Sequence, residues 1–373
     1  MTDKKILIVQ LSGGNDYLNC VVPYNDPPYI DNRPNVRITE DRVLPIGDGL
    51  GFNPAMGPIK SLFDDGNVAI LHGTGYPDPN RSHFRSMDIW HTAEPTKVGN
   101  EGWLGNAINQ MYPHHDNVVA AVNFGAGLPR ALVARGAPVA SVTDIDSYGL
   151  MNHLKESEQK SEMLEVFRDM YTQAIGTGPV IDFLSQTGLN ALKGADIIGS
   201  VTAKYQSEVE YGADSFGEAM KGAAQVFQAE IGTQICYTQH GTFDAHTNGI
   251  ALQESLLSDV SRGIYDFYTD MKNVDKSKDI LIFVFSEFGR RVMDNGNGTD
   301  HGSGGVAFVI GDSVSGGHYS EYPSMDPNKL VEGDLAFNLD FRSIYTELLE
   351  DWLQVESRPV VKGHYEKLGF LQN

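Results

Sequence analysis

Acidic, imidazole and hydroxyl side chains follow several apolar segments of the sequence, each time near the point where the segment ends. Carboxylate oxygens and imidazole nitrogens are ligands that zinc and manganese accept in proteins, so these residue types suit a divalent metal site. If the apolar segments are parallel strands, their carboxyl ends meet at one edge of a sheet, where ligands bind. The side chains are those of Asp16, Ser82, His83, Asp244, His246, Glu287, Asp300 and His301.

The stretch from residue 283 to 305 carries the densest group of polar side chains after an apolar run. The run, residues 280–285, has no polar alternation, which is typical of a strand buried on both faces. Glu287, Arg290 and Arg291 come at its end, where loops gather polar groups. The stretch therefore indicates either metal ligands with an arginine clamp for an anion, or a salt-bridged turn followed by a solvated loop.

Ser82 opens a segment with helical apolar spacing, residues 82–93. Free N–H groups at a helix N-terminus stabilise phosphate and sulfate groups, so a serine there is a candidate nucleophile. Arg81 could neutralise negative charge, and His83 could protonate a leaving group. Serine is also a preferred N-cap residue, and serine caps are far more common than serine nucleophiles.

Asp244 and His246 follow another apolar segment, residues 234–238. In an extended chain, side chains two positions apart point to the same side, so both residues could bind one ion. Asp16 ends a glycine-rich turn after the first predicted strand, residues 6–11, and glycines let a backbone approach a ligand closely. Alternatively, Asp244 and His246 are polar surface residues, and Asp16 belongs to an ordinary Asn-Asp turn.

The elements that must position these groups alternate between apolar runs and helical spacing, which is typical of an α/β fold with a mainly parallel sheet. We predict further strands at residues 68–71, 118–124, 131–133, 139–142 and 306–310, the last of which closes the sheet. We predict helices at residues 54–63, 157–175, 181–198, 215–230, 249–271 and 341–355. There is no long linker or internal repeat, so we expect one domain, residues 1–373.

The composition excludes some partners and locations. The net charge is −21, whereas nucleic-acid binding needs clustered Lys and Arg, so we expect no nucleic-acid partner. Two distant cysteines indicate neither a disulfide framework nor a cysteine zinc site. The N-terminal residues have no pattern of a leader sequence, and we find no apolar stretch long enough to span a membrane. We therefore expect a cytoplasmic protein without membrane association, or an exported one if a leader has been removed.

Six motifs together resemble the family called domain of unknown function 1501, which is placed in the alkaline phosphatase and sulfatase superfamily. They are GGNDYLN at 13–19, RSHF at 81–84, GWL at 102–104, FDAH at 243–246, FSEFGRR at 285–291 and GTDHG at 298–302. The resemblance implies a three-layer α/β/α fold with a mainly parallel sheet. It also implies a metal-dependent hydrolase of phosphate or sulfate esters, with zinc or manganese as cofactor and a small anionic ester as substrate.

Residue by residue, the resemblance implies roles for the groups named above. The metal ligands would be Asp16, Asp244, His246, Glu287 and His301, and the nucleophile would be Ser82. From the residues themselves we predict Asp300 or His83 as auxiliary ligands, and His83, Arg81 and Arg290 as catalytic residues beside Ser82. Phe288 stands where the superfamily has a second histidine ligand. The alternative is therefore a catalytically silent relative that binds an anionic sugar, a polymer or a partner protein in the same cleft.

Overall fold

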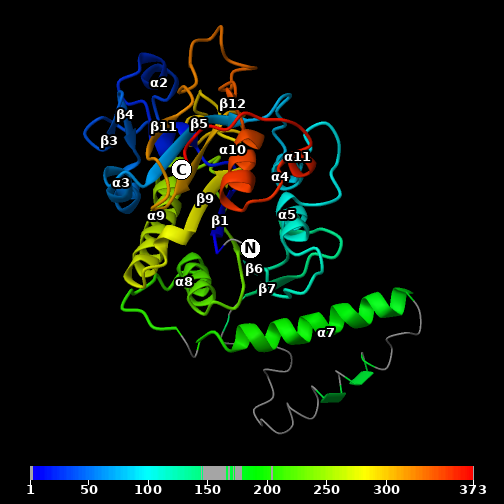
Figure 1. The fold of residues 1–373 in the computed structure, drawn as a ribbon. Helices are drawn as coiled ribbons and strands as arrows, with labels where there is room; N and C mark the ends of the chain where they lie inside the picture. The colour runs from blue at the N-terminus through cyan, green and yellow to red at the C-terminus, as the bar shows by residue number, and fades with distance from the viewer. Residues whose placement is uncertain are drawn as a thin grey trace.

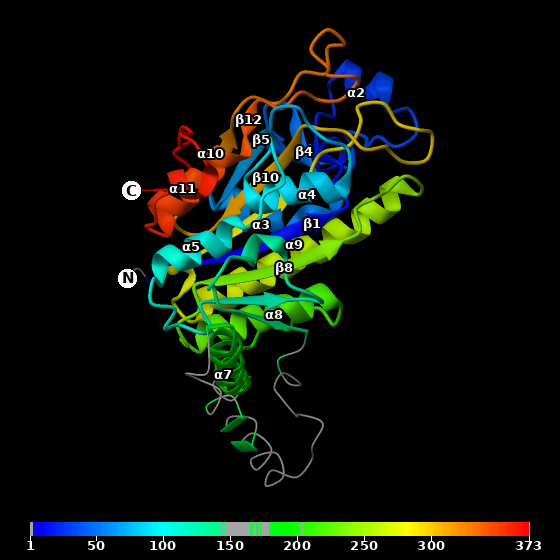
Figure 2. The ribbon, with the colours of Figure 1, turned by 90° about the vertical axis from the view of Figure 1, so that its right-hand side faces the viewer.

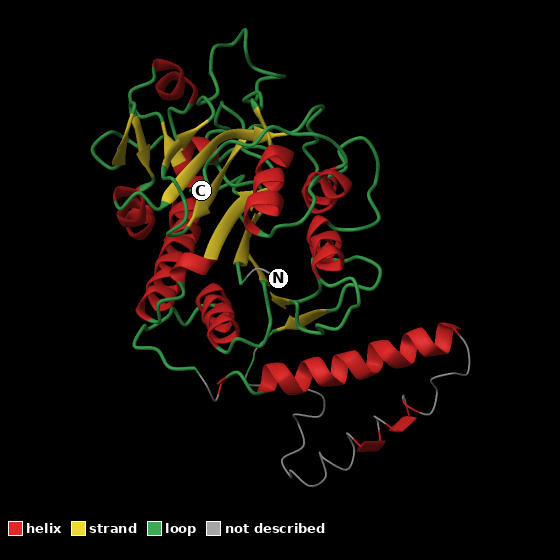
Figure 3. Cartoon of the chain, viewed as in Figure 1, coloured by secondary structure: helices red, strands yellow, loops and turns green. Residues whose placement is uncertain are grey.

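The computed structural model describes residues 3–143, 145, 165–166, 169–170, 172, 179–202 and 205–372. Its centre is a nine-stranded sheet with helices on both faces (Figure 1 and Figure 3). The strands are β1 (Lys5–Ser12), β5 (Val68–Gly75), β6 (Ala121–Phe124), β7 (Val139–Val142), β8 (Ile235–Gly241), β9 (Ile280–Ser286), β10 (Gly305–Ile310), β11 (Gly317–Tyr319) and β12 (Leu339–Asp340). This arrangement confirms the predicted three-layer α/β/α fold.

The order of the strands places the predicted site at one edge of the sheet. The order is β11-β5-β10-β9-β1-β8-β6-β7, with β12 paired to β5 outside this path. β1 lies between β8 and β9 and is parallel to both, and β10 is antiparallel to its two neighbours, β9 and β5. The carboxyl ends of β1, β5, β8 and β9 therefore lie at the same edge.

The prediction that residues 306–310 close the sheet is wrong, because β10 lies inside it. All six residues of β10 are buried, as expected for a strand with a neighbour on each side and helices above and below. An apolar run of this kind does not encode the direction of the strand. The sequence of this run therefore does not distinguish a strand that closes the sheet from an antiparallel strand between two others.

The side chains of β1 divide between two hydrophobic cores. Leu7 and Val9 pack in the core that contains residues of α3 (Gly57–Asp64), α8 (Ser215–Gln228) and α9 (Gly249–Asn273). Ile6 and Ile8 pack in the core that contains residues of α4 (His83–Thr92), α5 (Trp103–Met111) and α10 (Phe341–Glu347). This alternation places helices on both faces of the sheet, as Figure 1 and Figure 2 show.

A small antiparallel sheet, β2-β4-β3, lies beside the main one. Its strands are β2 (Val21–Val22), β3 (Leu44–Gly47) and β4 (Leu50–Phe52). Further helical elements are α1 (Tyr17–Cys20), α2 (Pro27–Asn32), the 21-residue α7 (Pro179–Gly199), the π-helical turn Leu348–Trp352 and α11 (Arg358–Val361). None of the described helices is long and apolar enough to cross a membrane.

One predicted element has a different structure, and another lies mostly outside the described residues. Residues 131–133 were expected to form a strand, but Arg130–Leu132 form a 3-10 helix in which Ala131 and Leu132 are buried. A short apolar run can be buried in a turn as well as in a strand, and periodicity does not distinguish them. The helix predicted at residues 157–175 lies mostly outside the described residues.

Candidate metal centre

Three imidazole nitrogens and one carboxylate oxygen converge at the carboxyl edge of the sheet. Nε2 of His301 lies 3.0 Å from Nε2 of His83 and 3.0 Å from Nε2 of His246. Oδ1 of Asp244 lies 3.1 Å from Nε2 of His301, 2.9 Å from Nε2 of His246 and 3.5 Å from Nε2 of His83. We call these four residues the His/Asp cluster.

The cluster is assembled from three segments that are distant in the chain. His83 is the first residue of α4, Asp244 and His246 lie between β8 and α9, and His301 lies between β9 and β10. α4 is anchored by Trp90, whose ring stacks on Phe285 and whose Nε1 donates to the carbonyl of Glu287 at 3.0 Å. This anchor, near the C-terminal end of α4, holds the helix against the end of β9, and His83 itself is bonded to Glu287, directly after β9.

The second ring nitrogen of each histidine, Nδ1, faces a hydrogen-bond acceptor. The pairs are His83 with Oε1 of Glu287 (2.8 Å), His246 with Oδ1 of Asp300 (2.9 Å) and His301 with the carbonyl oxygen of Arg81 (2.8 Å). Because these partners accept, each Nδ1 must carry the proton. A neutral imidazole with a proton on Nδ1 has a lone pair on Nε2.

Lone pairs on the Nε2 atoms of His83 and His301 and on Asp244 therefore face one another, within 4.8 Å, and the Nε2 atom of His246 faces His301 and Asp244. This arrangement is repulsive for neutral imidazoles unless a cation lies between them. The two histidine nitrogens and one carboxylate oxygen of His83, His301 and Asp244 are donors that a zinc ion accepts, and manganese accepts the same atoms; His246 adjoins this set. Acceptors behind the imidazoles are typical of metal-ligating histidines. The residues present therefore fit a divalent ion.

The electrostatics of the cluster keep its donor atoms available. The hydrogen bond from His83 to Glu287 raises the pKa of His83, which makes this imidazole a more basic ligand. Burial opposes ionisation of Asp244, but the hydrogen bond and the charge of Arg290 lower the pKa of its carboxyl overall. NH2 of Arg290 lies 2.6 Å from Oδ1 of Asp244. Asp244 is therefore ionised at neutral pH.

Arg290, predicted to bind the anionic substrate, stands behind Asp244. Its side chain is only 1% exposed, and it also donates to the carbonyl of Phe243 at 3.2 Å. Its Nε and NH1 atoms have no protein partner among the described residues, and both are shielded from solvent. We therefore assign Arg290 to the support of Asp244 rather than to contact with a substrate.

The structure does not bring Asp16 into the cluster as predicted. Oδ2 of Asp16 lies 2.7 Å from NH1 of Arg33, and both side chains are buried. Arg33 also donates to the carbonyl oxygens of Arg291 and Val292. The pair thus ties the turn after β1 to the loop after β9, and the positive charge of Arg33 takes the place that the prediction gave to a metal.

Glu287 and Asp300 contact histidines of the His/Asp cluster through Nδ1 and do so on the side away from the Nε2 atoms. Oε1 of Glu287 accepts from Nδ1 of His83 and from the N–H of Gly13 at 2.8 Å, so its position behind the ligands differs from the direct role predicted. Asp300 holds Nδ1 of His246, and this hydrogen bond lowers the pKa of Asp300. Both carboxylates hydrogen-bond to histidines of the cluster, whereas His83, predicted as an auxiliary ligand, is one of its converging residues.

Ser82 is the N-cap of α4, as predicted, but its side chain makes no capping hydrogen bond. The exposed hydroxyl is therefore not committed to the helix. Arg81 and Arg291, which were expected near an anion, both pair with Asp334, at N–O distances of 2.7 and 3.1 Å. Their guanidinium groups are held at Asp334, and the predicted clamp is not assembled around the cluster.

Phe288 forms a wall of the cluster and offers no ligand atom. Its ring centroid lies 4.9 Å from that of His83 and 5.3 Å from that of His301. Gly14 makes room for this ring: its φ is +73°, and a Cβ atom there would lie 2.4 Å from the Phe288 ring. The glycine turn after β1 is therefore needed for the close approach of Phe288 to the cluster.

A pocket of about 450 Å³ opens beside the cluster. Its walls include His83 and Asp244, the hydroxyl residues Ser12 and Thr242, and Arg130. Ser12 and Thr242 were missed, although both adjoin strand-end motifs, and no pattern in the sequence singled out Arg130. The volume is in the range of small-molecule sites.

A family model described as "Protein of unknown function (DUF1501)" matches residues 44–340. The chain belongs to this family. No curated protein matches the sequence of this DUF1501 chain.

The DUF1501 chain is similar in fold to several solved structures. One is the PsFucS1 sulfatase from Pseudoalteromonas sp., with 12% identity, coverage of 98% of this chain and 71% of that one, and a TM-score of 0.43. Another is Ps i-CgsB in complex with k-i-k-neocarrahexaose, with 8% identity, 97% and 75% coverage and a TM-score of 0.43. A third is a protein in the alkaline phosphatase superfamily from Vibrio parahaemolyticus, with 7% identity, 86% and 62% coverage and a TM-score of 0.39. This likeness concerns the fold and does not extend to activity.

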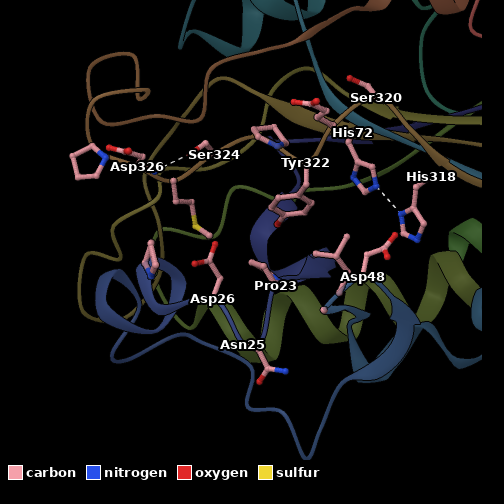
Figure 4. Close-up of a pocket in the computed structure, with 17 residues that line it drawn as sticks. Pro23, Asn25, Asp26, Asp48, His72, His318, Ser320, Tyr322, Ser324 and Asp326 are labelled. Atoms are coloured by element: carbon pink, nitrogen blue, oxygen red, sulfur yellow. Dashed lines mark hydrogen bonds between the residues drawn. The ribbon is translucent and has the colours of Figure 1, made fainter.

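A larger cavity of the DUF1501 chain, about 860 Å³, lies beside β5 and β11. Figure 4 shows His72 and His318 facing each other in its wall, with Nε2 of His72 2.8 Å from Nδ1 of His318. Carboxylates such as Asp26 and Asp48 line it, and the described lining residues include no Lys or Arg. Carboxylates line both spaces, but Arg130 and the N-terminal residue of α4, His83, line the smaller pocket, which is therefore the better candidate for an anionic ester.

Proposed function

We propose that this protein is a metal-dependent hydrolase of phosphate or sulfate esters. A zinc or manganese ion would be held by His83, Asp244 and His301, with His246 beside them as a further candidate ligand. The proposal rests on the convergence of the donor atoms of His83, Asp244 and His301, and on the hydrogen bonds behind the imidazoles, which fix the lone pairs on Nε2. When bound, such an ion neutralises developing charge on ester oxygens and lowers the pKa of a hydroxyl group.

The residues around the cluster orient the ligands and attract the substrate. Glu287 and Asp300 hold two imidazoles, and Arg290 keeps Asp244 ionised. The N-terminus of α4 lies at His83, and its free N–H groups favour a bound anion. Because the chain has a net charge of −21, an anionic ester needs this local positive field in order to bind.

Ser82 is the nucleophile that we propose. Its hydroxyl is exposed, is not used as a helix cap and lies one residue before His83. The hydroxyl oxygen would form a bond to phosphorus or sulfur while the bond to the leaving alkoxide breaks, and the serine proton would pass through solvent to that alkoxide. A water molecule would then hydrolyse the serine ester, which frees the serine hydroxyl and inorganic phosphate or sulfate. His83 is not available as a general acid, because Nδ1 donates to Glu287 and Nε2 belongs to the cluster.

The proposal is tested by metal content and turnover together. Elemental analysis after mild purification should find about one zinc or manganese ion per chain. Aryl phosphates and aryl sulfates should be hydrolysed with zinc or manganese supplied. His301→Ala should lose both metal and turnover, whereas His364→Ala, at an exposed histidine near the C-terminus, should keep both. A parent protein that neither contains nor takes up metal would overturn the proposal.

The role of Ser82 is tested separately. Ser82→Ala should abolish turnover and retain the metal. Full activity of this variant would exclude Ser82 as the nucleophile and leave the metal centre in place.

A catalytically silent relative is the second candidate. Phe288 in place of a ligand favours it, and so does the engagement of Arg81 and Arg291 with Asp334. This candidate would bind an anionic sugar, polymer or partner protein at the same pocket. It predicts binding of anions to the metal-loaded protein without turnover of either ester class.

A further inference from the structure

We infer that the hydroxyls of Ser12 and Thr242 form a paired donor site for the anionic oxygens of the ester, an inference that rests on the proposed function of the cluster. Both residues line the 450 Å³ pocket together with His83 and Asp244. They come from the ends of neighbouring strands, because Ser12 of β1 pairs with Gly241 of β8. The direction of their hydrogen bonds assigns them this role.

The hydroxyl of Ser12 accepts a hydrogen bond from the protein. Nε2 of Gln10 donates to Oγ of Ser12 at 2.7 Å. The Gln10 amide is held in this orientation, because its Oε1 accepts from the hydroxyl of Tyr237 and from Nε2 of His91. Burial lowers the pKa of His91 to about 3, so this histidine is neutral, and the buried Tyr237 keeps its proton. The Ser12 oxygen therefore faces a fixed donor.

The hydroxyl of Thr242 accepts in the same way. The N–H of Asp244 donates to Oγ1 of Thr242 at 3.2 Å. A Cβ atom on Gly13 would lie 2.6 Å from this oxygen, so the Thr242 side chain lies directly against Gly13. Since Gly13 follows Ser12, the two hydroxyls flank the same glycine. The absence of a side chain at Gly13 leaves room for the Thr242 hydroxyl beside the end of β1.

Each hydroxyl thus receives a hydrogen bond, and its own proton has no acceptor among the described residues. A hydroxyl has one proton to donate, and in an open pocket that proton goes to water or to a ligand. The N–H of Gly13, between these segments, is already bonded to Glu287, whereas the protons of the two hydroxyls are not bonded to a described residue. Oxygens of phosphate and sulfate groups are charged acceptors, which strengthens hydrogen bonds from such donors.

The experiment measures the binding of inorganic phosphate and of inorganic sulfate to the zinc-loaded protein by calorimetry, which requires no turnover. Ser12→Ala and Thr242→Val should each weaken phosphate binding about 10- to 100-fold, the range for a hydrogen bond to a charged group. Zinc content should not change. Ser12→Thr and Thr242→Ser keep the hydroxyls and should retain most of the affinity. Ser324→Ala, at an exposed serine in the wall of the larger cavity, is the matched control.

The outcomes separate this inference from the proposed function. Unchanged phosphate affinity in zinc-loaded Ser12→Ala and Thr242→Val would overturn the donor pair even if the parent hydrolyses esters. Reduced affinity in both variants of a parent without turnover would support the donor pair and reject the hydrolase. A zinc-loaded parent that binds neither anion would overturn the donor pair. Thr242 lies on an exposed loop, where a substitution is tolerated by the fold. If Ser12→Ala does not fold, the phosphate affinity of Thr242→Val therefore tests the donor pair.

Discussion

Oε1 of Glu287 lies 2.8 Å from Nδ1 of His83, and the same oxygen accepts the N–H of Gly13 at 2.8 Å. One carboxylate oxygen therefore links the start of α4 to the turn after β1. It holds a proton on Nδ1 of His83 and leaves Nε2 free for the cluster. The geometry of the site thus depends on a residue that does not itself face the other donor atoms.

Glu287→Gln should weaken zinc binding about 10- to 100-fold, the usual cost of losing a partner behind a metal ligand. The amide preserves the shape of the side chain but removes the charge that makes His83 more basic. Competition with a chromogenic chelator measures the affinity. Glu366→Gln, at an exposed glutamate, should bind zinc as the parent does. Parent-like affinity in Glu287→Gln would show that His83 does not depend on this carboxylate.

Asp16→Asn should destabilise the fold and leave the metal content unchanged. The substitution leaves Arg33 charged and buried without its partner, which costs about 3–5 kcal/mol in comparable cases. Urea denaturation measures the free energy of unfolding. Asp64→Asn, which breaks the exposed pair with Lys60, should cost no more than about 1 kcal/mol. Loss of zinc from Asp16→Asn with parent-like stability would instead restore Asp16 as a ligand.

His72 should make the folded state sensitive to acid. Burial, together with nearby His318, lowers the pKa of His72 from 6.5 to about 3. The unfolded chain therefore takes up a proton near pH 6.5, whereas the folded protein does so only near pH 3. The contribution of His72 to stability is complete above pH 6.5 and is lost as the pH falls towards 3.

The free energy of unfolding, measured by urea denaturation at a series of pH values below 6.5, tests this contribution. It should fall less steeply with decreasing pH in His72→Gln than in the parent. His364→Gln, at an exposed histidine, should match the slope of the parent. If the unfolding free energy of His72→Gln falls with decreasing pH as steeply as that of the parent, His72 is protonated in the folded protein at mildly acidic pH.

Gly14→Ala should be more destabilising than Gly47→Ala. Gly14 and Gly47 have φ angles of +73° and +93°, which alanine adopts only with strain, so both variants are destabilised by this backbone strain. Only the Cβ at Gly14 meets another group, the Phe288 ring at 2.4 Å, whereas nothing lies within 4 Å of the Cβ at Gly47. In a double-mutant cycle, Phe288→Ala should relieve part of the cost of Gly14→Ala. Equal costs for the two glycine variants would contradict the close packing.

The sequence was sufficient to predict the sheet and much of the cluster. Apolar runs identified β1, β8 and β9, and the polar residues after them placed Asp244, His246 and His301 together. It did not predict the direction of β10, because an all-apolar strand looks the same in either orientation. It also misplaced Asp16, because the pairing with Arg33 arises only when the loop after β1 folds back.

The roles of Glu287, Ser12 and Thr242 depend on which atom of a side chain donates and which accepts. That information lies in distances between segments far apart in the chain. The residue types allow several such patterns, and the fold selects one of them. His83 shows the same limit: its position at the start of a helix was predicted, but its direct contact with His301 was not.

His83 and His301 are 218 positions apart in the chain, and their Nε2 atoms are 3.0 Å apart. A single ion bound by both would act as a cross-link that closes a very long loop. The entropy lost by the unfolded chain on such closure grows with loop length. The two cysteines are free and buried, so no disulfide fulfils this function in the described chain. Chelation should therefore loosen the attachment of the start of α4 to the loop after β9, and proteolysis there should accelerate before the sheet itself opens.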